Sequence, residues 1–295
     1  MGYFIQKAIE LDEVNRKKVP LTTLADYTLM AKYDGCHGLV TFYEGAPGKK
    51  DRVLCRTGSG DPWLSVHEGI LNPLYDRWVE LGRPGPYFTF AGEAWMVGTD
   101  HATINGTFRR QSPQPDLRFV QFDTIQHDIK NVLADWRTFF ERLARASDEL
   151  RSVYIATSWP ATDLEDAELT AKCLKDGSSA YDGCVLVHKH KPYKPGRCRD
   201  GEKIKVKPAL EFDLRVIRFN PANGEKTGKI TGSITVDFEG KELDVAVLRE
   251  DDLEELHADN NAWAGRIVAV EAMARSSKGL LREPRLKGGP RIDKK

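Results

Sequence analysis

The sequence lacks the features that mark a secreted, membrane-bound or zinc-binding protein. Its 295 residues include only five cysteines, an odd number, and no two of them are spaced C-x-x-C. Neither a disulfide framework nor a zinc finger is therefore predicted. No signal peptide is visible and no apolar run is long enough to span a bilayer. We expect a cytoplasmic protein with no membrane partner.

Net charge is also absent, since 44 lysines and arginines balance 44 aspartates and glutamates. The charge is nevertheless unevenly placed: residues 188–207 and residues 275–295 each hold eight basic and two acidic residues. Removing these sixteen basic and four acidic residues from the totals leaves 28 basic and 40 acidic residues. Such concentration of positive charge is typical of a protein that presents one face to a polyanion such as a nucleic acid. Two solvated surface segments are the alternative.

Lys32 is the first candidate for chemistry. It lies in Ala31-Lys32-Tyr33-Asp34-Gly35, between strand-like segments at 27–30 and 39–43. Asp-Gly is a frequent hairpin turn, so Lys32 is expected at the lip of a hairpin. An amine is a nucleophile only when it is neutral, and its ordinary pKa is about 10.4. We therefore expect cationic neighbours or a metal ion to lower the pKa of Lys32. A solvated lysine beside an ordinary turn is the alternative.

Three further segments carry candidate contacts to a nucleotide or nucleic acid. Arg56 precedes Thr57-Gly58, where glycine lets backbone N–H groups approach a phosphate that the guanidinium can clamp. Glu93 follows a strand-like run that begins at residue 87, a usual place for a ribose or metal contact. Phe122, in a strand predicted at 117–123, is a candidate for base stacking or else a core phenylalanine. Arg109 and Arg110 end a segment, 105–110, that is predicted to be a polar loop.

Asp182 and an alternating lysine segment complete the candidates. Asp182-Gly183 leads into an apolar strand, and residues 203–208 alternate strictly between lysine and apolar residues. Alternation places Lys203, Lys205 and Lys207 on one face of a strand. Because three lysines repel each other unless an anion lies among them, Lys205 and Lys207 are expected to contact phosphate. Lys203, nearer the preceding loop, is expected to be solvated.

The remaining pattern predicts an α+β fold with two domains. Helices are expected near residues 6–16, 65–81, 135–153 and 163–176. Beyond Pro208 the composition changes to short strands at 212–219, 229–238, 242–248 and 264–273, with one helix near 251–259. This pattern suits a small Greek-key barrel. We expect a boundary near Pro208, which separates residues 1–208 from residues 209–295.

Taken in order, these segments resemble the ATP-dependent DNA ligases of the covalent nucleotidyltransferase superfamily, in particular the compact bacteriophage type. The likeness runs from about residue 28 to the end of the chain. Its segments are similar to the family's adenylated-lysine, phosphate, ribose, adenine-stacking, metal, lysine-pair and C-terminal motifs: Lys32-Tyr33-Asp34-Gly35, Arg56-Thr57-Gly58, Gly92-Glu93, Phe122-Asp123, Asp182-Gly183, Lys205 with Lys207, and Arg282-Glu283-Pro284-Arg285 through Arg291-Ile292-Asp293-Lys294.

The resemblance implies a nucleotidyltransferase (adenylation) domain at 1–208 and an OB-fold at 209–295. It implies that Lys32, helped by Lys205 and Lys207, takes AMP from ATP, passes it to the 5′-phosphate of nicked double-stranded DNA, and lets the 3′-hydroxyl displace it. The implied metal ion is Mg²⁺ or Mn²⁺, held by Glu93 and Asp182, and the chain is expected to act as a monomer. The implied DNA contacts are Arg56, Arg109 and Arg110. The implied nucleotide contacts are Met30, Ala31, Lys32, His37, Arg56, Glu93, Phe122, Asp182, Lys205, Lys207, Arg285 and Lys294.

Three positions depart from the family's usual pattern. His37 stands where the family usually has arginine, Ala91 where it often has aspartate, and Asp182 where it usually has glutamate. Aspartate is shorter by one methylene, about 1.5 Å, so a metal ion must be reached through water or by a shifted strand. Two other functions stay open: an RNA ligase or GTP-dependent capping enzyme, which shares the lysine motif, and a non-catalytic barrel protein that binds nucleic acid.

Overall fold

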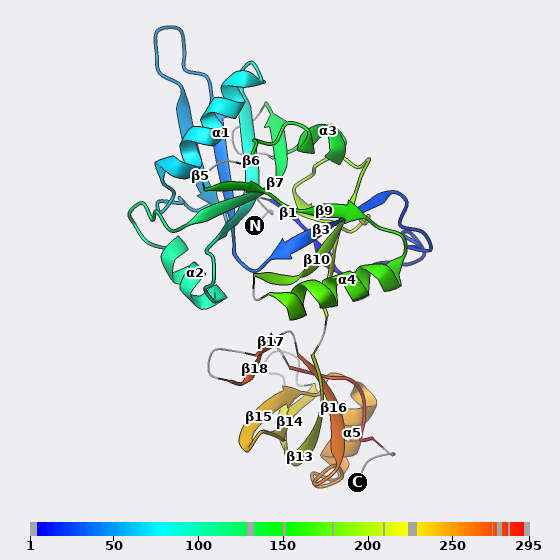
Figure 1. Cartoon of the computed structure of the whole chain (residues 1–295). Helices are drawn as coiled ribbons and strands as arrows, with labels where there is room; N and C mark the ends of the chain where they lie inside the picture. Colours follow the sequence, from blue (N-terminus) through cyan, green and yellow to red (C-terminus); the bar gives the residue numbers. More distant parts are fainter. Residues whose placement is uncertain are drawn as a thin grey trace. The chain divides into compact units, whose positions relative to one another are not determined.

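The computed structural model describes residues 5–128, 133–149, 152–178, 180–208, 210–223, 229–272, 274–275, 279–282 and 284–291. The chain divides into two compact units, Met1–Lys207 and Pro208–Lys295 (Figure 1). The first combines helices with two five-stranded sheets and a short two-stranded one, and the second contains a closed five-stranded barrel, so the predicted α+β fold with a terminal barrel is confirmed. The five cysteines are free thiols. Across the described residues, no helix combines the length and apolar character needed to cross a membrane.

The first unit is built on two five-stranded sheets. The first sheet has the order β2-β12-β10-β3-β9 and the second has the order β5-β4-β6-β7-β8. The strands of the first sheet are β2 (Ile9–Glu10), β12 (Lys203–Val206), β10 (Tyr181–His188), β3 (Tyr27–Tyr33) and β9 (Ser158–Pro160). Those of the second are β5 (Arg52–Thr57), β4 (Cys36–Tyr43), β6 (Tyr87–Trp95), β7 (Arg118–His127) and β8 (Val153–Ile155).

The two sheets share a buried apolar cluster. Met30 of β3 and Val187 of β10 pack there with Val120 of β7 and with Phe139, and the partly buried Phe122 and Tyr33 lie against them. Residues of both sheets thus bury the same apolar surface, which is the main favourable term in holding such layers together. Side chains at the edge of this cluster are therefore positioned by both sheets.

The predicted hairpin at Lys32 is wrong. β3 pairs with β9 and β10, whereas β4 pairs with β5 and β6, so the two strands on either side of Asp34-Gly35 belong to different sheets. Gly35 is needed at this crossing, because a Cβ atom there would lie 2.3 Å from the backbone oxygen of Ala94. A local turn signal does not say which sheet the next strand joins.

Two of the four helices predicted in the first unit are confirmed. α1 (Glu68–Glu80) and α4 (Leu164–Gly177) match the segments expected at 65–81 and 163–176. Only α3 (Phe139–Leu143) forms within the described part of 135–153, because Asp135 is buried and pairs with Tyr193 instead of starting a helix. Residues 6–16 form β1 (Gln6–Lys7), β2 and the 3-10 turn η1 (Leu11–Glu13), with β1 paired to β11 (Gly196–Arg197).

The segment 105–110 is also not the predicted loop. α2 spans His101–Phe108, and Asp100 caps it by accepting a hydrogen bond from the backbone N–H of Thr103 at 2.8 Å. Arg109 and Arg110 therefore follow directly on the end of a helix. Aspartate is a preferred N-cap residue, so Asp100 was a signal in the sequence for a helix here.

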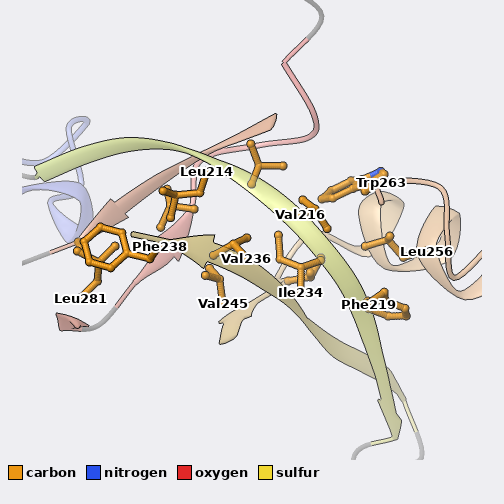
Figure 2. Packing of buried hydrophobic residues seen from close by; sticks show 14 of the residues in the cluster. Leu214, Val216, Phe219, Ile234, Val236, Phe238, Val245, Leu256, Trp263 and Leu281 are labelled. Carbon is orange, nitrogen blue, oxygen red and sulfur yellow. The ribbon is translucent and has the colours of Figure 1, made fainter. Parts of the chain in front are cut away.

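The second unit is a barrel of order β13-β14-β15-β19-β16, closed because β16 also pairs with β13. Its inward side chains form one apolar core with Leu256 and Trp263, as Figure 2 shows for Val216, Ile234 and Val236. The four predicted strands and the predicted helix are confirmed as β13 (Leu210–Asn223), β14 (Ile230–Phe238), β15 (Lys241–Ala246), β16 (Ile267–Ala272) and α5 (Glu250–Ala258). The short strands β17 (Ala274–Arg275), β18 (Leu281–Arg282) and β19 (Arg285–Leu286) were not predicted.

Candidate active site

Lys32 is the centre of a charged cluster at the end of β3. Its Nζ lies 3.0 Å from Oδ2 of Asp182, and the same oxygen lies 2.7 Å from Nζ of Lys207. All three side chains are mostly buried, with exposed fractions of 23% for Lys32, 13% for Asp182 and 16% for Lys207. One carboxylate thus holds two amines side by side, and the pair of cations presents a site suited to an anion such as a phosphate.

A β-bulge aims Asp182 at Lys32. Tyr181 pairs with Tyr33 and Gly183 pairs with Lys32, so Asp182 is the extra residue on β10 between these pairs. Gly183 has φ of +124°, in the region that glycine adopts most easily. Bulges often redirect a side chain beside a functional site. The bulge brings the Asp182 carboxylate into direct contact with Lys32.

The charge state of Lys32 differs from the prediction. Burial alone would lower the pKa of the Lys32 amine, but the carboxylates of Asp182 and Glu93 outweigh burial and raise the pKa above its ordinary value. Burial would likewise raise the pKa of Asp182, and here Lys32 and Lys207 outweigh it and lower that pKa. In this arrangement the amine is protonated and the carboxylate is ionised. A role as a nucleophile would therefore require that Lys32 first lose its proton.

Glu93 faces the same cluster from the second sheet. It lies on β6 opposite His37, and its carboxylate interacts electrostatically with Lys32, Asp34 and Asp182. Burial raises the pKa of Glu93 to about 7, partly opposed by Lys32. The described residues contain no group of three or more potential metal ligands. Two carboxylates fit Mg²⁺ all the same, because this ion is usually bound by one or two carboxylates together with water and substrate phosphates.

Phe122 also occupies a bulge, on β7. Asp123 pairs with Ala91 and Gln121 pairs with Gly92, which leaves Phe122 as the extra residue. Its ring meets the ring of His37 edge to face, with centroids 5.3 Å apart. Phe122 also packs against the cluster that contains Met30. Three of the predicted nucleotide contacts are therefore neighbours although they are far apart in the sequence.

His37 is a partly buried, uncharged histidine. Burial, with a further contribution from Lys203, lowers the pKa of its imidazole from 6.5 to about 4. Its Nε2 atom is buried and has no hydrogen-bond partner within the described structure. The backbone oxygen of His37 accepts a hydrogen bond from the N–H of Gly58 at 2.9 Å. This bond fixes the loop that follows Arg56 beside His37.

The predicted alternation of the lysine strand is confirmed, since Ile204 and Val206 are buried on the opposite face. Each lysine of this segment pairs with a different carboxylate: Lys203 lies 3.0 Å from Asp123, Lys205 lies 2.8 Å from Glu10, and Lys207 pairs with Asp182. The expectation that Lys203 is solvated is wrong, because its side chain is only 10% exposed. Repulsion between the lysines is relieved by these carboxylates.

Several cations of the two basic segments form ion pairs, which their composition did not predict. Arg197 also pairs with Glu13, and in the second unit Arg275, Lys287 and Arg291 pair with carboxylates. Neither segment is therefore an unneutralised strip of positive charge. Ion pairing of this kind depends on neighbours that are distant in the sequence, so composition alone does not show it.

The other predicted contacts lie on separate elements of the two units. Ala31 is buried on β3, where its N–H donates to the backbone oxygen of Thr157 at 2.9 Å, and Arg56 lies on β5 opposite Leu39. Arg109 is exposed after α2, and Arg110 donates to Gln114 at 2.9 Å. Arg285 lies on β19 in the second unit. Lys294 lies outside the described residues.

Sequence reasoning missed two groups near the site. The carboxylate of Asp34 lies 3.4 Å from Nδ1 of His101, at the start of α2. The buried Asp123 is bound by Arg142, with Nε at 2.7 Å and Nη2 at 3.1 Å, as well as by Lys203. Asp123 directly follows Phe122, and an aspartate inside an apolar strand was a signal that a buried cation would be needed.

No family model and no curated protein matches the chain. Solved structures do match along nearly its whole length. The Pmar-Lig_PreS3 structure is 17% identical, with a TM-score of 0.70, and the match covers 98% of this chain and 68% of that one. A structure from a study of Lig E DNA ligases is 17% identical, with a TM-score of 0.63, and the match covers 96% of this chain and 97% of that one.

The ATP-dependent DNA ligase of bacteriophage T7, in complex with ATP, is 16% identical, with a TM-score of 0.52, and the match covers 98% of both chains. At identities this low, the structural match establishes a common fold and nothing about the chemistry, which must be argued from the residues. The Lig E and bacteriophage T7 structures are DNA ligases, the latter ATP-dependent, and the chain has the fold that they share.

Proposed function

We propose that the chain is an ATP-dependent DNA ligase that seals a 5′-phosphate to a 3′-hydroxyl at nicks in duplex DNA. The observation that carries this proposal is the position of Lys32, which shares the carboxylate of Asp182 with Lys207 and faces Glu93 from the other sheet. An ordinary surface lysine is solvated and is not surrounded by buried charged groups in this way. The fold shared with ligases, including one bound to ATP, supports the same conclusion.

In the first step, Lys32 attacks the α-phosphorus of ATP. The N–P bond forms, the bond to the pyrophosphate oxygen breaks, and pyrophosphate leaves with the bonding electrons. Lys32 must first lose its proton, and Asp182, whose Oδ2 lies 3.0 Å from Nζ, is the acceptor within reach. The incoming phosphates attract Lys207 away from Asp182, which leaves this carboxylate more basic and able to take the proton. Lys207, and Lys205 on the same face of β12, then stabilise negative charge on the phosphates. The product is a lysyl-AMP phosphoramidate.

The base and ribose of ATP are proposed to lie between the two sheets. Phe122 stacks on the adenine, Met30 and Ala31 line the pocket, and His37 offers its unpartnered Nε2 to a polar group of the nucleotide. Glu93 and Asp182 would hold Mg²⁺ or Mn²⁺ together with phosphate oxygens. A bound divalent ion would supply Lewis-acid stabilisation of the phosphoryl oxygens.

In the second and third steps, AMP passes to the 5′-phosphate at the nick and the 3′-hydroxyl then displaces it. Arg56, Arg109 and Arg110 are the proposed contacts to the DNA backbone, which is where most protein–DNA hydrogen bonds are made. Arg285 and Lys294 of the second unit are proposed to act on the pyrophosphate of ATP. The first unit, residues 1–208, is the proposed adenylation domain and residues 209–295 the proposed OB-fold domain, acting together in a monomer.

Nick sealing tests the proposal. A duplex with one 5′-labelled nick is incubated with the protein, ATP and Mg²⁺, and the labelled strand is resolved by length. We expect a joined strand with ATP and none with GTP or NAD. A matched nick whose 3′-hydroxyl strand is RNA separates DNA ligation from RNA ligation. Joining with GTP, joining of RNA alone, or DNA binding with no joining under any condition would contradict the proposal.

A further inference from the structure

A buried cluster of charge lies behind Phe122, and the proposed chemistry does not use it. Asp123 is fully buried, and Arg142 binds it through two nitrogens at 2.7 and 3.1 Å. This bidentate pair already compensates the carboxylate. Lys203 nevertheless adds a second cation at 3.0 Å from Oδ2 of Asp123, with only 10% of its side chain exposed. The cluster therefore holds one more positive charge than burial of Asp123 requires.

The additional cation lies against aromatic rings. Nζ of Lys203 is 5.4 Å from the ring centroid of Phe122 and 5.3 Å from that of Tyr193. Both distances fall within the range at which an ammonium is attracted to an aromatic ring. The hydroxyl of Tyr193 in turn accepts a hydrogen bond from the backbone N–H of Gln6 at 3.0 Å. Lys203 is thus held between a carboxylate and two rings, and it is too enclosed to bind a phosphate directly.

Phe122 needs such support because it is the extra residue of a bulge. A bulged residue lacks its own pair of ladder hydrogen bonds with the neighbouring strand. Phe122 and Asp123 lie on β7 of the second sheet, whereas Lys203 lies on β12 of the first. The ion pair and the ring contact therefore join the two sheets at the residue whose ring the proposed function assigns to the base.

We propose that Lys203 is a positioning residue that fixes the ring of Phe122, and with it the base of the bound nucleotide, through its contacts with Asp123 and the ring. This inference rests on the proposed function. It predicts that Lys203 acts on the affinity for the nucleoside part of ATP. In the proposed function Lys205 and Lys207 contact the phosphates and Lys32 is the nucleophile. The rate of the chemical step should therefore not depend on Lys203.

The test is single-turnover formation of the labelled protein–AMP adduct across a range of ATP concentrations. Lys203→Met keeps the length and apolar stem of the side chain and removes its charge. We expect the ATP concentration for half-maximal rate to rise about tenfold, the scale of one cation–ring contact together with an ion pair. The rate at saturating ATP should stay within about threefold of the wild-type value. Lys172→Met, on an exposed position of α4, is the matched control and should change neither quantity.

Inhibition by tripolyphosphate separates positioning of the base from general distortion of the site. This anion has phosphates but no base, so its inhibition constant should be unchanged in Lys203→Met. If that variant does not fold, as judged by circular dichroism, Lys203→Gln retains a donor to Asp123 and should show the same selective rise with a smaller factor. An unchanged ATP dependence in a folded variant, or an equal loss for ATP and tripolyphosphate, would overturn the inference. Absence of any adduct in the wild-type protein would instead contradict the proposed function.

Discussion

Lys207 and Lys32 compete for one carboxylate, and this competition defines the role that each amine takes. Both lie within 3.0 Å of Oδ2 of Asp182. When phosphate takes the place of Asp182 as the partner of Lys207, Asp182 is left with Lys32 alone and becomes a better acceptor for the Lys32 proton. Lys207 is therefore expected to act both on the charge of the phosphates and on the availability of the nucleophile.

Lys207→Ala should reduce the rate of adduct formation with ATP by at least about 100-fold, the scale of losing one donor to a developing negative charge. The measurement is single-turnover labelling at saturating ATP. Lys172→Ala removes an exposed lysine of α4 and should leave the rate unchanged. A Lys207→Ala enzyme within about threefold of the wild-type rate would show that another cation serves the phosphates.

His37 should make the protein sensitive to acid. Burial, together with Lys203, holds the pKa of the folded imidazole at about 4, below its ordinary value of 6.5. As the pH falls from 6.5 towards 4, the unfolded chain binds a proton that the folded chain does not, so the free energy of unfolding decreases. His37→Gln removes this difference. Its loss of unfolding free energy between pH 7 and pH 5, from urea denaturation, should be smaller than that of the wild type by about 1–2 kcal/mol. Equal losses of unfolding free energy in the two proteins would show that the pKa of His37 is not lowered by folding.

At the scale of elements, the strands were predictable and their pairing was not. Alternation and apolar runs located β3, β7, β10 and β12, because these patterns depend on near neighbours in the chain. The hairpin at Asp34-Gly35 was wrong because sheet membership depends on packing of distant strands. The bulges at Phe122 and Asp182 were equally hidden, since register is set by the partner strand.

Gly35 offers a test of the crossing between the two sheets. A Cβ atom there would lie 2.3 Å from the oxygen of Ala94, a backbone atom that cannot move without disturbing β6. Gly35→Ala should therefore lower the free energy of unfolding by about 1–3 kcal/mol. Gly106, in α2, has open space where a Cβ atom would lie, and Gly106→Ala should stabilise by about 0.5–1 kcal/mol. Urea denaturation of both variants gives the comparison, and equal effects would contradict the crossing.

At the scale of the whole molecule, the two-part plan followed from the sequence, since composition changes to short strands beyond Pro208. The pairing of charged side chains could not be predicted from the sequence, because ion pairs such as Lys205–Glu10 join residues far apart in the chain. Lys32, the proposed nucleophile, and the lysine strand were singled out by their motifs. The support given by Lys203, Asp123 and Arg142 was not, because buried charge pairs leave no periodic pattern.

Arg285 tests whether the second unit takes part in adenylation. Deletion of residues 282–295 would be a poor test, because it removes β19, the strand that completes the barrel. Arg285→Ala leaves the strand in place. If Arg285 acts on the departing pyrophosphate, the substitution should slow adduct formation from ATP by about tenfold to 100-fold. Sealing of a nick that already bears 5′-AMP should be nearly unchanged, because no pyrophosphate departs there. Equal losses in the two assays would assign Arg285 to DNA binding or to stability.

The most direct test of the central claim is peptide mapping of the protein after incubation with ATP and Mg²⁺. Digestion followed by mass spectrometry should find one adenylyl group, on the peptide that contains Lys32. The adduct should be lost in acid and survive alkali, as expected of a P–N bond, and it should be absent from Lys32→Ala. An adenylyl group on another residue, or one that persists in Lys32→Ala, would contradict the account.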